Sequence, residues 1–364
     1  MGITDKIKDI EYEMSRTQKN KATEHHLGLL KAKLAKLRQE LLEDVKSGGK
    51  GEGFDVQKSG VARVAMLGFP SVGKSTLLSK LTSTESTAAN YEFTTLTAIP
   101  GKLKLHGTEV QLLDLPGIIQ GAASGKGRGR QVCAIIRTAD LVLFMLDATK
   151  DVEQLRILMR ELEYMGIRIN KEPPNIYIKQ KQAGGIYFNA TCKQSQLNSK
   201  TISAILKDQK IHHAEVIVHG DYSVDDFVDV LVGNRKYIRG LMCYNKIDAV
   251  PLERVEELAL QPRSVVISCE MGLNLDYLLE AIWTNLDLIR IYTKRKGNYP
   301  DFENGLVVKR TTTVLQICRM IHKTLEKDFK CALVWGSSAK HCPQQVGISH
   351  LLEDEDVIQI LKKI

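Results

Sequence analysis

The chain has 364 residues, of which 43% are apolar and 26% charged, and its formal net charge at pH 7 is +8. This length suggests two or three domains, and the composition is that of a globular protein with a real core. The strongly apolar stretches, such as residues 141–146, are much shorter than the ~20 residues that a membrane-spanning helix needs, so no membrane span is expected. The mild basic bias permits a polyanionic partner without requiring one.

The N-terminus and the cysteines both favour the cytoplasm. The first residues, MGITDKIKDIEYE, are too charged for a signal peptide. The cysteines form no CxxC pair, so the sequence predicts neither a disulfide framework nor a zinc ribbon. A reduced, cytosolic compartment fits this usage best. The seven cysteines are Cys133, Cys192, Cys243, Cys269, Cys318, Cys331 and Cys342.

Residues 1–46 are predicted to form a basic helical hairpin. Apolar side chains recur at steps of three and four, first over 3–14 and again over 27–41, which places one stripe on each helix. The basic residues between 16 and 38 are equally compatible with a solvated helix face and with an RNA-binding surface. The glycine-rich start of residues 47–60 predicts a flexible linker.

Short apolar strands alternate with helices from residue 61 onward, which indicates a parallel sheet covered on both faces. About ninety residues separate two of these strands, so we expect a small inserted α/β domain over 168–238. The insertion would divide the sheet domain into residues 61–167 and 239–289, and a third unit would follow over 290–364. The predicted strands are 61–67, 110–115, 139–147, 239–245 and 264–268, and the clearest predicted helices are 151–165 and 274–289.

The strongest chemical signal is GFPSVGKS over 68–75, the pattern GxxxxGK[ST] between a predicted strand and a predicted helix. Its glycines let main-chain N–H groups close around phosphate oxygens, and the helix N-terminus adds partial positive charge. Lys74 would reach the β- and γ-phosphates, and the Ser75 hydroxyl would bind magnesium. A glycine-rich turn is the alternative, which the flanking elements disfavour. The nucleotide-binding residues predicted here are Gly68, Phe69, Pro70, Ser71, Val72, Gly73, Lys74, Ser75 and Thr76.

A second motif, DLPG over 114–117, ends the strand 110–115. The Asp114 carboxylate would therefore lie at the carboxyl end of a strand, where it can bind magnesium through water. The Gly117 N–H can meet the γ-phosphate. A DxxG pattern alone is weak evidence, but its position after a strand strengthens the prediction of a phosphate site.

Two more motifs predict recognition of guanine. NKID over 245–248 supplies Asn245, Lys246 and Asp248, and the Asp248 carboxylate can accept two hydrogen bonds from guanine N1 and N2. Adenine cannot make this pair, and an unpaired buried carboxylate is costly. Main-chain amides of Ser268 and Cys269 could meet guanine O6. Four motifs in this order, each after an apolar strand, predict a guanine-nucleotide site.

The run LPGIIQGAASGKGRGRQ over 115–131, with FTTL over 93–96, resembles the Obg branch of translation-factor GTPases. The insertion, the C-terminal unit and the N-terminal stretch NKATEHHLGLLKAKLAKLR make the whole chain similar to the developmentally regulated GTP-binding proteins. The resemblance implies a cytoplasmic GTPase that binds ribosomes or ribosomal RNA and a companion protein with an RWD domain. It further implies a ribosomal-protein-like inserted domain, a C-terminal β-grasp (TGS) domain and a hydroxylated Lys21.

The resemblance also assigns roles around the phosphates. Thr95 matches the first-switch threonine whose hydroxyl binds magnesium when the γ-phosphate is present, although the adjacent Thr94 is not excluded and a plain turn threonine is the alternative. Asp114 and Gly117 match the second switch. Catalysis is thus expected to depend on Lys74, Thr95 and Gly117, and Ser75 and Thr95 are the expected magnesium ligands.

Three positions depart from familiar GTPase patterns. Ile118 stands where Ras-like proteins have a water-orienting glutamine, so a slow intrinsic rate is expected, and Gln120 is not assumed to replace it. Ser71 stands where potassium-dependent relatives often have Asn or Asp, which leaves activation by K⁺ open. Glu270 replaces the more usual lysine of the last motif, so main-chain contacts are expected to act there.

The remaining features do not change this interpretation. A second basic cluster over 290–310 modestly favours an RNA surface such as a ribosome. The paired histidines and the group over 331–342 lack the spacing of metal ligands. The predicted function is a Mg²⁺-dependent GTP switch of translation; the alternatives are a nucleotide-gated RNA scaffold with negligible turnover and a P-loop ATPase. The basic cluster comprises Arg290, Lys294, Arg295, Lys296, Lys309 and Arg310.

Overall fold

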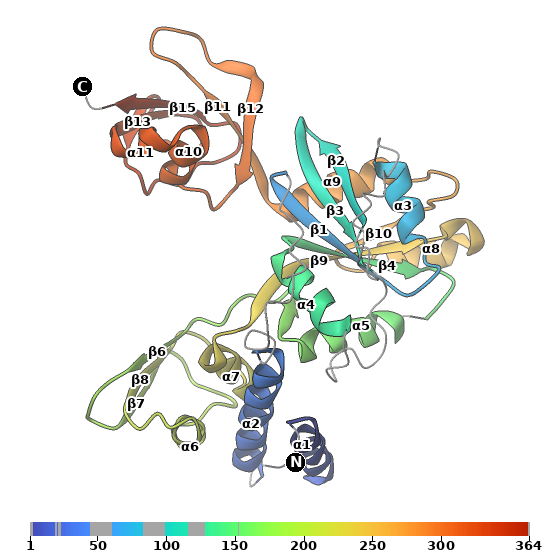
Figure 1. Ribbon diagram of the computed structural model, residues 1–364, viewed down its shortest axis with the longest axis vertical. Coiled ribbons are helices and arrows are strands. Elements are labelled where there is room, and N and C mark those ends of the chain that lie inside the picture. Colours follow the sequence, from blue (N-terminus) through green and yellow to red (C-terminus); the bar gives the residue numbers. More distant parts are fainter. Residues whose placement is uncertain are drawn as a thin grey trace. The chain divides into compact units, whose positions relative to one another are not determined.

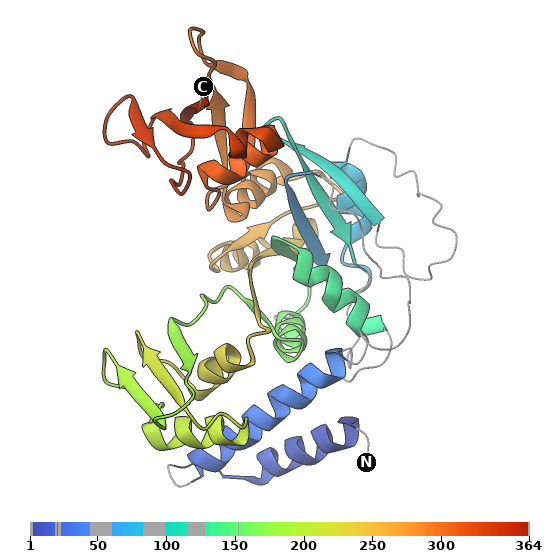
Figure 2. The same ribbon diagram turned by 60° about the vertical axis from the view of Figure 1, so that its left-hand side comes forward.

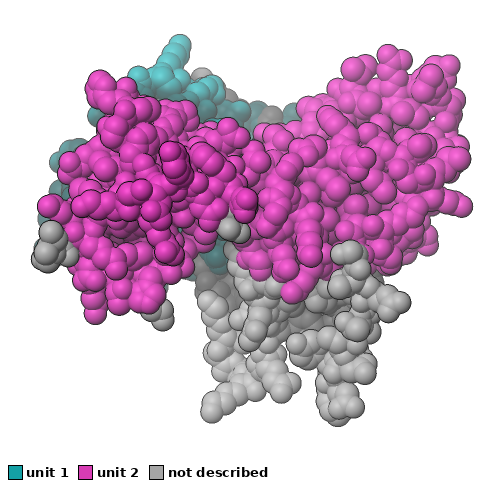
Figure 3. Space-filling model, turned by 90° about the horizontal axis from the view of Figure 1, so that it is seen from above, with its two compact units in different colours: residues 1–56, 118–138, 152–239 teal, residues 57–117, 139–151, 240–364 magenta. Residues whose placement is uncertain are grey.

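The computed structural model describes residues 3–18, 20, 23–43, 60–82, 99–115, 128–151 and 153–362. Figures 1 and 2 show its helices and strands, and Figure 3 colours its two compact units. Unit 1 contains residues 1–56, 118–138 and 152–239; unit 2 contains residues 57–117, 139–151 and 240–364. No helix within the described ranges has the length and apolar character needed to span a bilayer.

Unit 2 is built on a sheet with the strand order β10-β9-β4-β1-β3-β2 (Figure 1). β1 pairs in parallel with β3 and β4, β10 pairs in parallel with β9, and β2 runs antiparallel to β3. Every residue of β1 and β4 is buried, as expected for central strands covered on both faces. The predicted parallel sheet is thereby confirmed. The strands are β1 (Ala62–Leu67), β2 (Ile99–Leu105), β3 (Thr108–Asp114), β4 (Leu141–Asp147), β9 (Lys236–Asn245) and β10 (Ser264–Val266).

The helices of this sheet bury one apolar stripe each. Leu77 of α3 and Leu278 and Ile282 of α9 are fully buried in the same core as the strands. The four-residue step from Leu278 to Ile282 is that of a helix lying on a sheet. The helical segments are α3 (Lys74–Leu81), η2 (Ile247–Ala249), α8 (Leu252–Ala259) and α9 (Leu275–Leu286).

The C-terminal part of unit 2 has its own mixed sheet, in the order β12-β11-β15-β13-β14. β11 and β15 pair in parallel, and α10 packs on this sheet through Val314 and Ile317. Thr313 and Gln316 form a capping box that fixes the start of α10. The elements are β11 (Leu288–Thr293), β12 (Asp301–Lys309), α10 (Val314–Ile321), α11 (Lys323–Lys327), β13 (Phe329–Trp335), β14 (Gln344–Val346) and β15 (Val357–Lys362).

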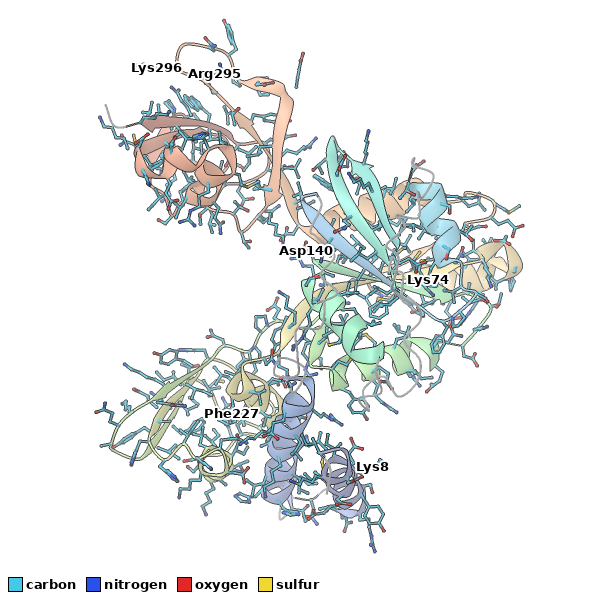
Figure 4. All side chains as sticks on the ribbon, in the orientation of Figure 1. Lys8, Lys74, Asp140, Phe227, Arg295 and Lys296 are labelled. Atoms are coloured by element: carbon cyan, nitrogen blue, oxygen red, sulfur yellow. The ribbon has the colours of Figure 1, made fainter. Side chains whose placement is uncertain are left out.

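Unit 1 combines the N-terminal hairpin with the inserted elements, which follow the expected order of strand, strand, helix, strand and helix. Their small sheet has the order β6-β8-β7, and the fully buried Phe227 of α7 lies in its core (Figure 4). The elements are α1 (Ile3–Arg16), α2 (Glu24–Glu43), α4 (Arg128–Thr138), α5 (Glu153–Tyr164), β5 (Ile167–Ile169), β6 (Ile176–Gln180), β7 (Ile186–Ala190), α6 (Ser199–Asp208), β8 (Ala214–Val218) and α7 (Val224–Val232).

α2 shares the core of the inserted elements. Ala32 and Ala35 are buried together with Ile202 and Ile205 of α6, so the second helix of the hairpin packs on two partners at once. Small side chains allow this close approach of helices, which is why the stripe on this face is made of alanine and glycine rather than leucine. The hairpin is therefore an integral part of unit 1.

The basic residues of α2 mostly face acidic partners. Lys31 lies 2.7 Å from Asp225 of α7, and Lys33 lies 3.7 Å from Asp208 of α6. Arg38 pairs with Glu11 at 2.7 Å and also covers the ring of Tyr164. These contacts within unit 1 weaken the RNA-surface interpretation for these cations. The predicted linker 47–60, except for Gly60, lies outside the described residues.

Candidate functional site

The phosphate loop connects the end of β1 with the start of α3 in unit 2, and Lys74 stands at that helix start (Figure 4). Ser71 and Gly73 have positive φ angles of 65° and 95°, which turn successive main-chain N–H groups toward one side of the loop. A Cβ on Gly73 would lie 2.3 Å from Asn245 Nδ2, and one on Gly68 would lie 2.4 Å from the Met145 carbonyl oxygen. Only glycine therefore fits at both positions.

Lys74 and Asp114 are the charged side chains that lie next to this loop. Lys74 Nζ donates to the carbonyl oxygens of Gly68 and Phe69 at 2.9 Å and 3.0 Å. Burial lowers the pKa of Lys74, and the nearby Asp114 carboxylate partly offsets this effect. Burial likewise raises the pKa of Asp114, against the effects of Lys74 and of a hydrogen bond from Ser75. Lys74 and Asp114 are thus close enough to interact, but their mutual attraction does not fully offset the cost of burying the two charges.

The residues at this end fit a magnesium ion. Ser75 Oγ donates to Asp114 Oδ2 at 3.1 Å, and Asp114 Oδ1 is buried with no hydrogen-bond partner in the described part of the chain. A hydroxyl oxygen beside an unsatisfied carboxylate oxygen is the hard-oxygen donor set that Mg²⁺ prefers. Ser75 and Asp114, two of the three residues predicted to hold the ion, are therefore adjacent in space.

The base-recognition end lies at the carboxyl ends of β9 and β10. Asp248, an exposed residue, accepts a hydrogen bond from the fully buried Ser268 at 2.5 Å through its Oδ1. The Ser268 hydroxyl also accepts from the Met271 N–H at 3.2 Å. Ser268 thereby fixes the carboxylate direction while the second carboxylate oxygen is left for a ligand. This side-chain role of Ser268 was not part of the sequence prediction.

The amides proposed for guanine O6 already have partners within the protein. The Ser268 N–H donates to the Leu273 carbonyl oxygen at 3.2 Å, and the Cys269 N–H donates to Asn245 Oδ1 at 2.9 Å. Burial raises the pKa of the Cys269 thiol to about 11, so this thiol stays protonated at neutral pH. A direct contact of these amides with a base would require them to share or exchange these bonds.

Asn245 joins the two halves of the site. Its Nδ2 donates to the Val72 carbonyl oxygen of the phosphate loop at 2.8 Å, while its Oδ1 accepts from Cys269 in the base loop. Asn245 is buried, so both bonds are protected from water. One amide group therefore holds the phosphate loop and the base loop in register.

Asp147, at the end of β4, is a site residue that the sequence analysis missed. Its carboxylate accepts from Lys246 Nζ at 2.7 Å and from the N–H and hydroxyl of Thr149. Burial opposes ionisation, but these hydrogen bonds hold the pKa of Asp147 below its ordinary value. The signal in the sequence was the polar residue that ends the apolar run 141–146.

Several predicted residues cannot be placed. Thr95, its neighbour Thr94, Gly117 and Lys21 lie outside the described residues, as do Ile118 and Gln120. Their predicted roles remain predictions. Among the described residues, no cluster of three or more His, Cys, Asp or Glu side chains could hold a metal, and all seven cysteines are free.

Comparison with known proteins agrees with this geometry. A family model described as "50S ribosome-binding GTPase" matches residues 63–180, one described as the C-terminal region of the same domain matches 183–288, and a TGS domain model matches 289–362. The sequence is 59% identical to "Developmentally-regulated GTP-binding protein 2 homolog" of Dictyostelium discoideum and to "Developmentally-regulated GTP-binding protein 2" of Homo sapiens. Each alignment covers 100% of both chains. "GTP-binding protein 1" of Schizosaccharomyces pombe is 58% identical, with the same coverage. The chain therefore belongs to the developmentally regulated GTP-binding proteins, and it is a GTP-binding protein with a P-loop GTPase domain and a C-terminal TGS domain.

Proposed function

We propose that this protein binds GTP with Mg²⁺, hydrolyses it slowly to GDP and phosphate, and uses the difference between the two states as a switch on the cytoplasmic translation machinery. The observation that carries this proposal is the Asn245 bridge, since it joins a phosphate loop to a base loop across one sheet edge. A fixed distance between the two loops is required when a single ligand contacts both of them, as a nucleotide does with its phosphates and its base.

The phosphates would be held by the N–H groups of residues 68–73 and by Lys74, whose ammonium group would exchange the carbonyl oxygens of Gly68 and Phe69 for phosphate oxygens. Ser75 and Thr95 would hold magnesium, and Asp114 would reach it through water. When bound, the ion neutralises charge on the β- and γ-phosphate oxygens. Gly117 would contact the γ-phosphate, so that the segment after it responds to hydrolysis.

Turnover is expected to be slow. Hydrolysis is an in-line attack of water, and Ile118 cannot orient that water as a glutamine does. Ser71 could bind K⁺ as an additional cation through its hydroxyl group, although a hydroxyl is a weaker ligand than a carboxamide. A scaffold that binds nucleotide with negligible turnover is the second candidate, and Ile118 is the observation that favours it.

Guanine specificity would come from Asp248. Its carboxylate, oriented by Ser268, would accept hydrogen bonds from guanine N1 and N2. Isothermal titration calorimetry with GTP and GDP in the presence of Mg²⁺ tests binding, and competition by ATP tests the ATPase alternative. Asp248→Asn should shift the preference toward xanthine nucleotides by at least about a hundredfold, while Asp276→Asn, at an exposed position on α9, should change nothing. Equal displacement by ATP would contradict the role of Asp248.

The reaction itself is tested by single-turnover hydrolysis of GTP with and without K⁺. We expect a rate above the buffer blank that falls when Lys74→Ala removes the phosphate-binding ammonium. A rate no faster than the blank under all conditions would leave the scaffold as the function.

The partners proposed are a ribosome or ribosomal RNA and a companion protein with an RWD domain, and the proposed modification site is Lys21. The support for RNA is the loop between β11 and β12, which carries Lys294, Arg295 and Lys296 and also Tyr299, which is 95% exposed. Cations and an exposed aromatic ring on one loop suit phosphates and bases together. Pelleting with ribosomes in GDP and in a non-hydrolysable GTP analogue tests switch and target at once; equal pelleting in both would contradict the switch.

A further inference from the structure

Unit 1 contains a buried charge cluster that nucleotide binding does not use. Asp229 of α7 is 5% exposed, and its two carboxylate oxygens accept from Arg168 at 2.6 Å and 2.9 Å and from Arg235 at 2.8 Å. Arg137, at the end of α4, donates through Nη2 to the main-chain carbonyl oxygen of Asn234. We call Arg168, Asp229 and Arg235 the neck cluster.

The neck cluster lies where the chain enters and leaves the inserted elements. β5 pairs in parallel with the first residues of β9, and these two strands flank the insertion in the sequence. Arg168 belongs to β5, and Arg235 directly precedes β9. Asp229 therefore links both of these strands to α7 through its hydrogen bonds to the two arginines. Asp229 is the shared acceptor of both arginines, so loss of its carboxylate would leave two partly buried guanidinium groups without this partner.

α4 touches the neck cluster on its other side. Cys133 Sγ lies 3.9 Å from the Met165 carbonyl oxygen, and the next residue, Gly166, accepts from the Lys236 N–H at 3.1 Å. A Cβ on Gly166 would lie only 2.6 Å from Arg235 Nη1. The turn after α5 is therefore closely packed, with the end of α4 on it and Arg235 of the neck cluster against Gly166.

The contacts continue from α7 to the N-terminal hairpin. Asp225 pairs with Lys31 of α2 at 2.7 Å. An added Cβ on Gly28 would lie 3.4 Å from Val224 Cγ1, which is ordinary van der Waals contact. A shift of α7 must therefore be followed by α2, or these contacts break. α4, α7 and α2 form a continuous path within unit 1.

The contact between Arg137 and Asn234 is the weakest step of this path. Asp229 is held by several charge-assisted bonds, whereas Arg137 is anchored next to the neck cluster through one carbonyl oxygen. Its Nε is buried and makes no hydrogen bond to the described part of the chain. Arg137 is partly buried and only partly satisfied, so its contact with Asn234 is held less firmly than the paired Asp229 carboxylate.

In the chain, α4 is the first described element after the DxxG motif, the segment that responds to the γ-phosphate in P-loop GTPases. We propose that Arg137 couples α4 to the neck cluster, so that the nucleotide state changes the stability of α7 and α2. The inserted domain and the hairpin are then output elements of the switch. This inference rests on the proposed GTP switch.

Amide hydrogen exchange of the full chain, measured with GDP and with a non-hydrolysable GTP analogue, tests the coupling. Peptides from α4 and from α7 should both differ between the two nucleotides, by roughly threefold or more in α7. Arg137→Gln should retain the difference in α4 and lose the one in α7, with GTP affinity unchanged. The matched control Arg319→Gln, which removes a guanidinium paired with Glu326 in unit 2, should keep both differences. A nucleotide-dependent difference in α7 that survives Arg137→Gln overturns the coupling.

A double-mutant cycle without nucleotide separates this inference from the proposed function. Arg137→Gln, Arg235→Gln and the double variant are compared by the exchange rate of α7. Coupled residues should give effects that differ from additivity by roughly threefold or more. Additive effects would overturn the coupling of Arg137 to the neck cluster, whether or not GTP binds. If calorimetry shows no GTP uptake, the proposed switch fails, and the double-mutant cycle still tests whether Arg137 and Arg235 are coupled.

Discussion

Asn245 illustrates how one side chain can set the geometry of two loops. Because its partners are the Val72 carbonyl oxygen and the Cys269 N–H, truncation leaves one acceptor and one donor buried and unpaired. We expect Asn245→Ala to weaken GTP and GDP alike by roughly 2–4 kcal/mol, since it disturbs both ends of the nucleotide. Calorimetry measures this loss.

The matched control for this prediction is Asn285→Ala. Asn285 also donates through its side-chain amide to a main-chain carbonyl oxygen, that of Ala281, but within α9. Its truncation should leave nucleotide affinity unchanged. Equal affinity of Asn245→Ala and wild type would show that the two loops keep their register without the bridge.

Asp114 links the site to the pH dependence of stability. Burial raises the pKa of Asp114 in the folded state above the ordinary value of an aspartate, with the opposing influence of Lys74 and Ser75 too small to cancel it. A raised pKa means that the folded state binds the proton more tightly than the unfolded state. The nucleotide-free protein should therefore lose stability as pH rises from about 3.8 through the folded-state pKa of this group.

Asp114→Asn tests this prediction. The variant removes the buried charge, so the thermal midpoint of the nucleotide-free protein should rise at neutral pH, and this part of the pH dependence should disappear. Binding of GTP that depends on Mg²⁺ should weaken in the same variant. A lower midpoint at neutral pH, with the pH profile unchanged, would contradict the interpretation.

At the scale of elements, the sequence predicted most where the signal was local. Apolar runs placed β1, β4 and β9, and the motifs at their ends placed Lys74, Asp114 and Asp248 at one sheet edge, since the carboxyl ends of parallel strands meet there. The Asn245 bridge was not predictable, because its partner Val72 lies 173 positions away in the sequence. The role of Asp147 depends in the same way on Lys246, which follows the end of another strand, β9.

The packing of α2 was hidden for a different reason. The leucine stripe predicted one partner, α1, but the second buried face of α2 is made of Gly28, Ala32 and Ala35. Small residues carry little periodic signal in a hydrophobicity pattern, because they are common on exposed faces too. Only the tertiary structure distinguishes them as a contact surface for α6 and α7.

Gly28 provides a test of that contact. An added Cβ would make ordinary contacts with Thr201, Ile205 and Val224, so Gly28→Ala should stabilise α2 by about 0.5–1 kcal/mol through its higher helix propensity. Gly28→Leu should instead destabilise the shared core by about 1–3 kcal/mol from overpacking. Hydrogen exchange of α6 and α7 measures both effects in the intact chain. Equal exchange in both variants would mean that α2 does not pack there in solution.

At the scale of the molecule, the structure divides the C-terminal basic cluster into two sets. Lys309 pairs with Asp140, which directly precedes β4 and is labelled in Figure 4. Arg290 and Arg310 pair with acids of the C-terminal unit or its entry, so these three cations serve the protein's own structure. The second set is Lys294, Arg295 and Lys296, which make no ion pair with the described residues. Lys294 Nζ lies 4.7 Å from the centroid of the Trp335 ring, and Arg295 and Lys296 stand at the loop between β11 and β12 (Figure 4). The number of basic residues in this cluster therefore overstates the cations available to a partner.

The same division predicts which residues control the salt dependence of RNA binding. Phosphate contacts release counterions, and each contact to single-stranded RNA contributes about 0.7 to the slope of log affinity against log salt. The double variant Arg295→Gln/Lys296→Gln should therefore lower that slope by about 1.4, as measured by pelleting with ribosomes over a salt series. Tyr299→Ala should weaken binding without changing the slope, because stacking releases no counterions.

The charge-matched control is Arg254→Gln/Arg319→Gln. It removes the same two charges, but from arginines that pair with Glu257 and Glu326. If only the total charge of the chain mattered, both double variants would change the slope equally, because long-range attraction does not depend on which cation is lost. A slope that changes in the loop variant alone would place the phosphate contacts at the loop between β11 and β12; equal changes would assign RNA binding to the overall charge instead.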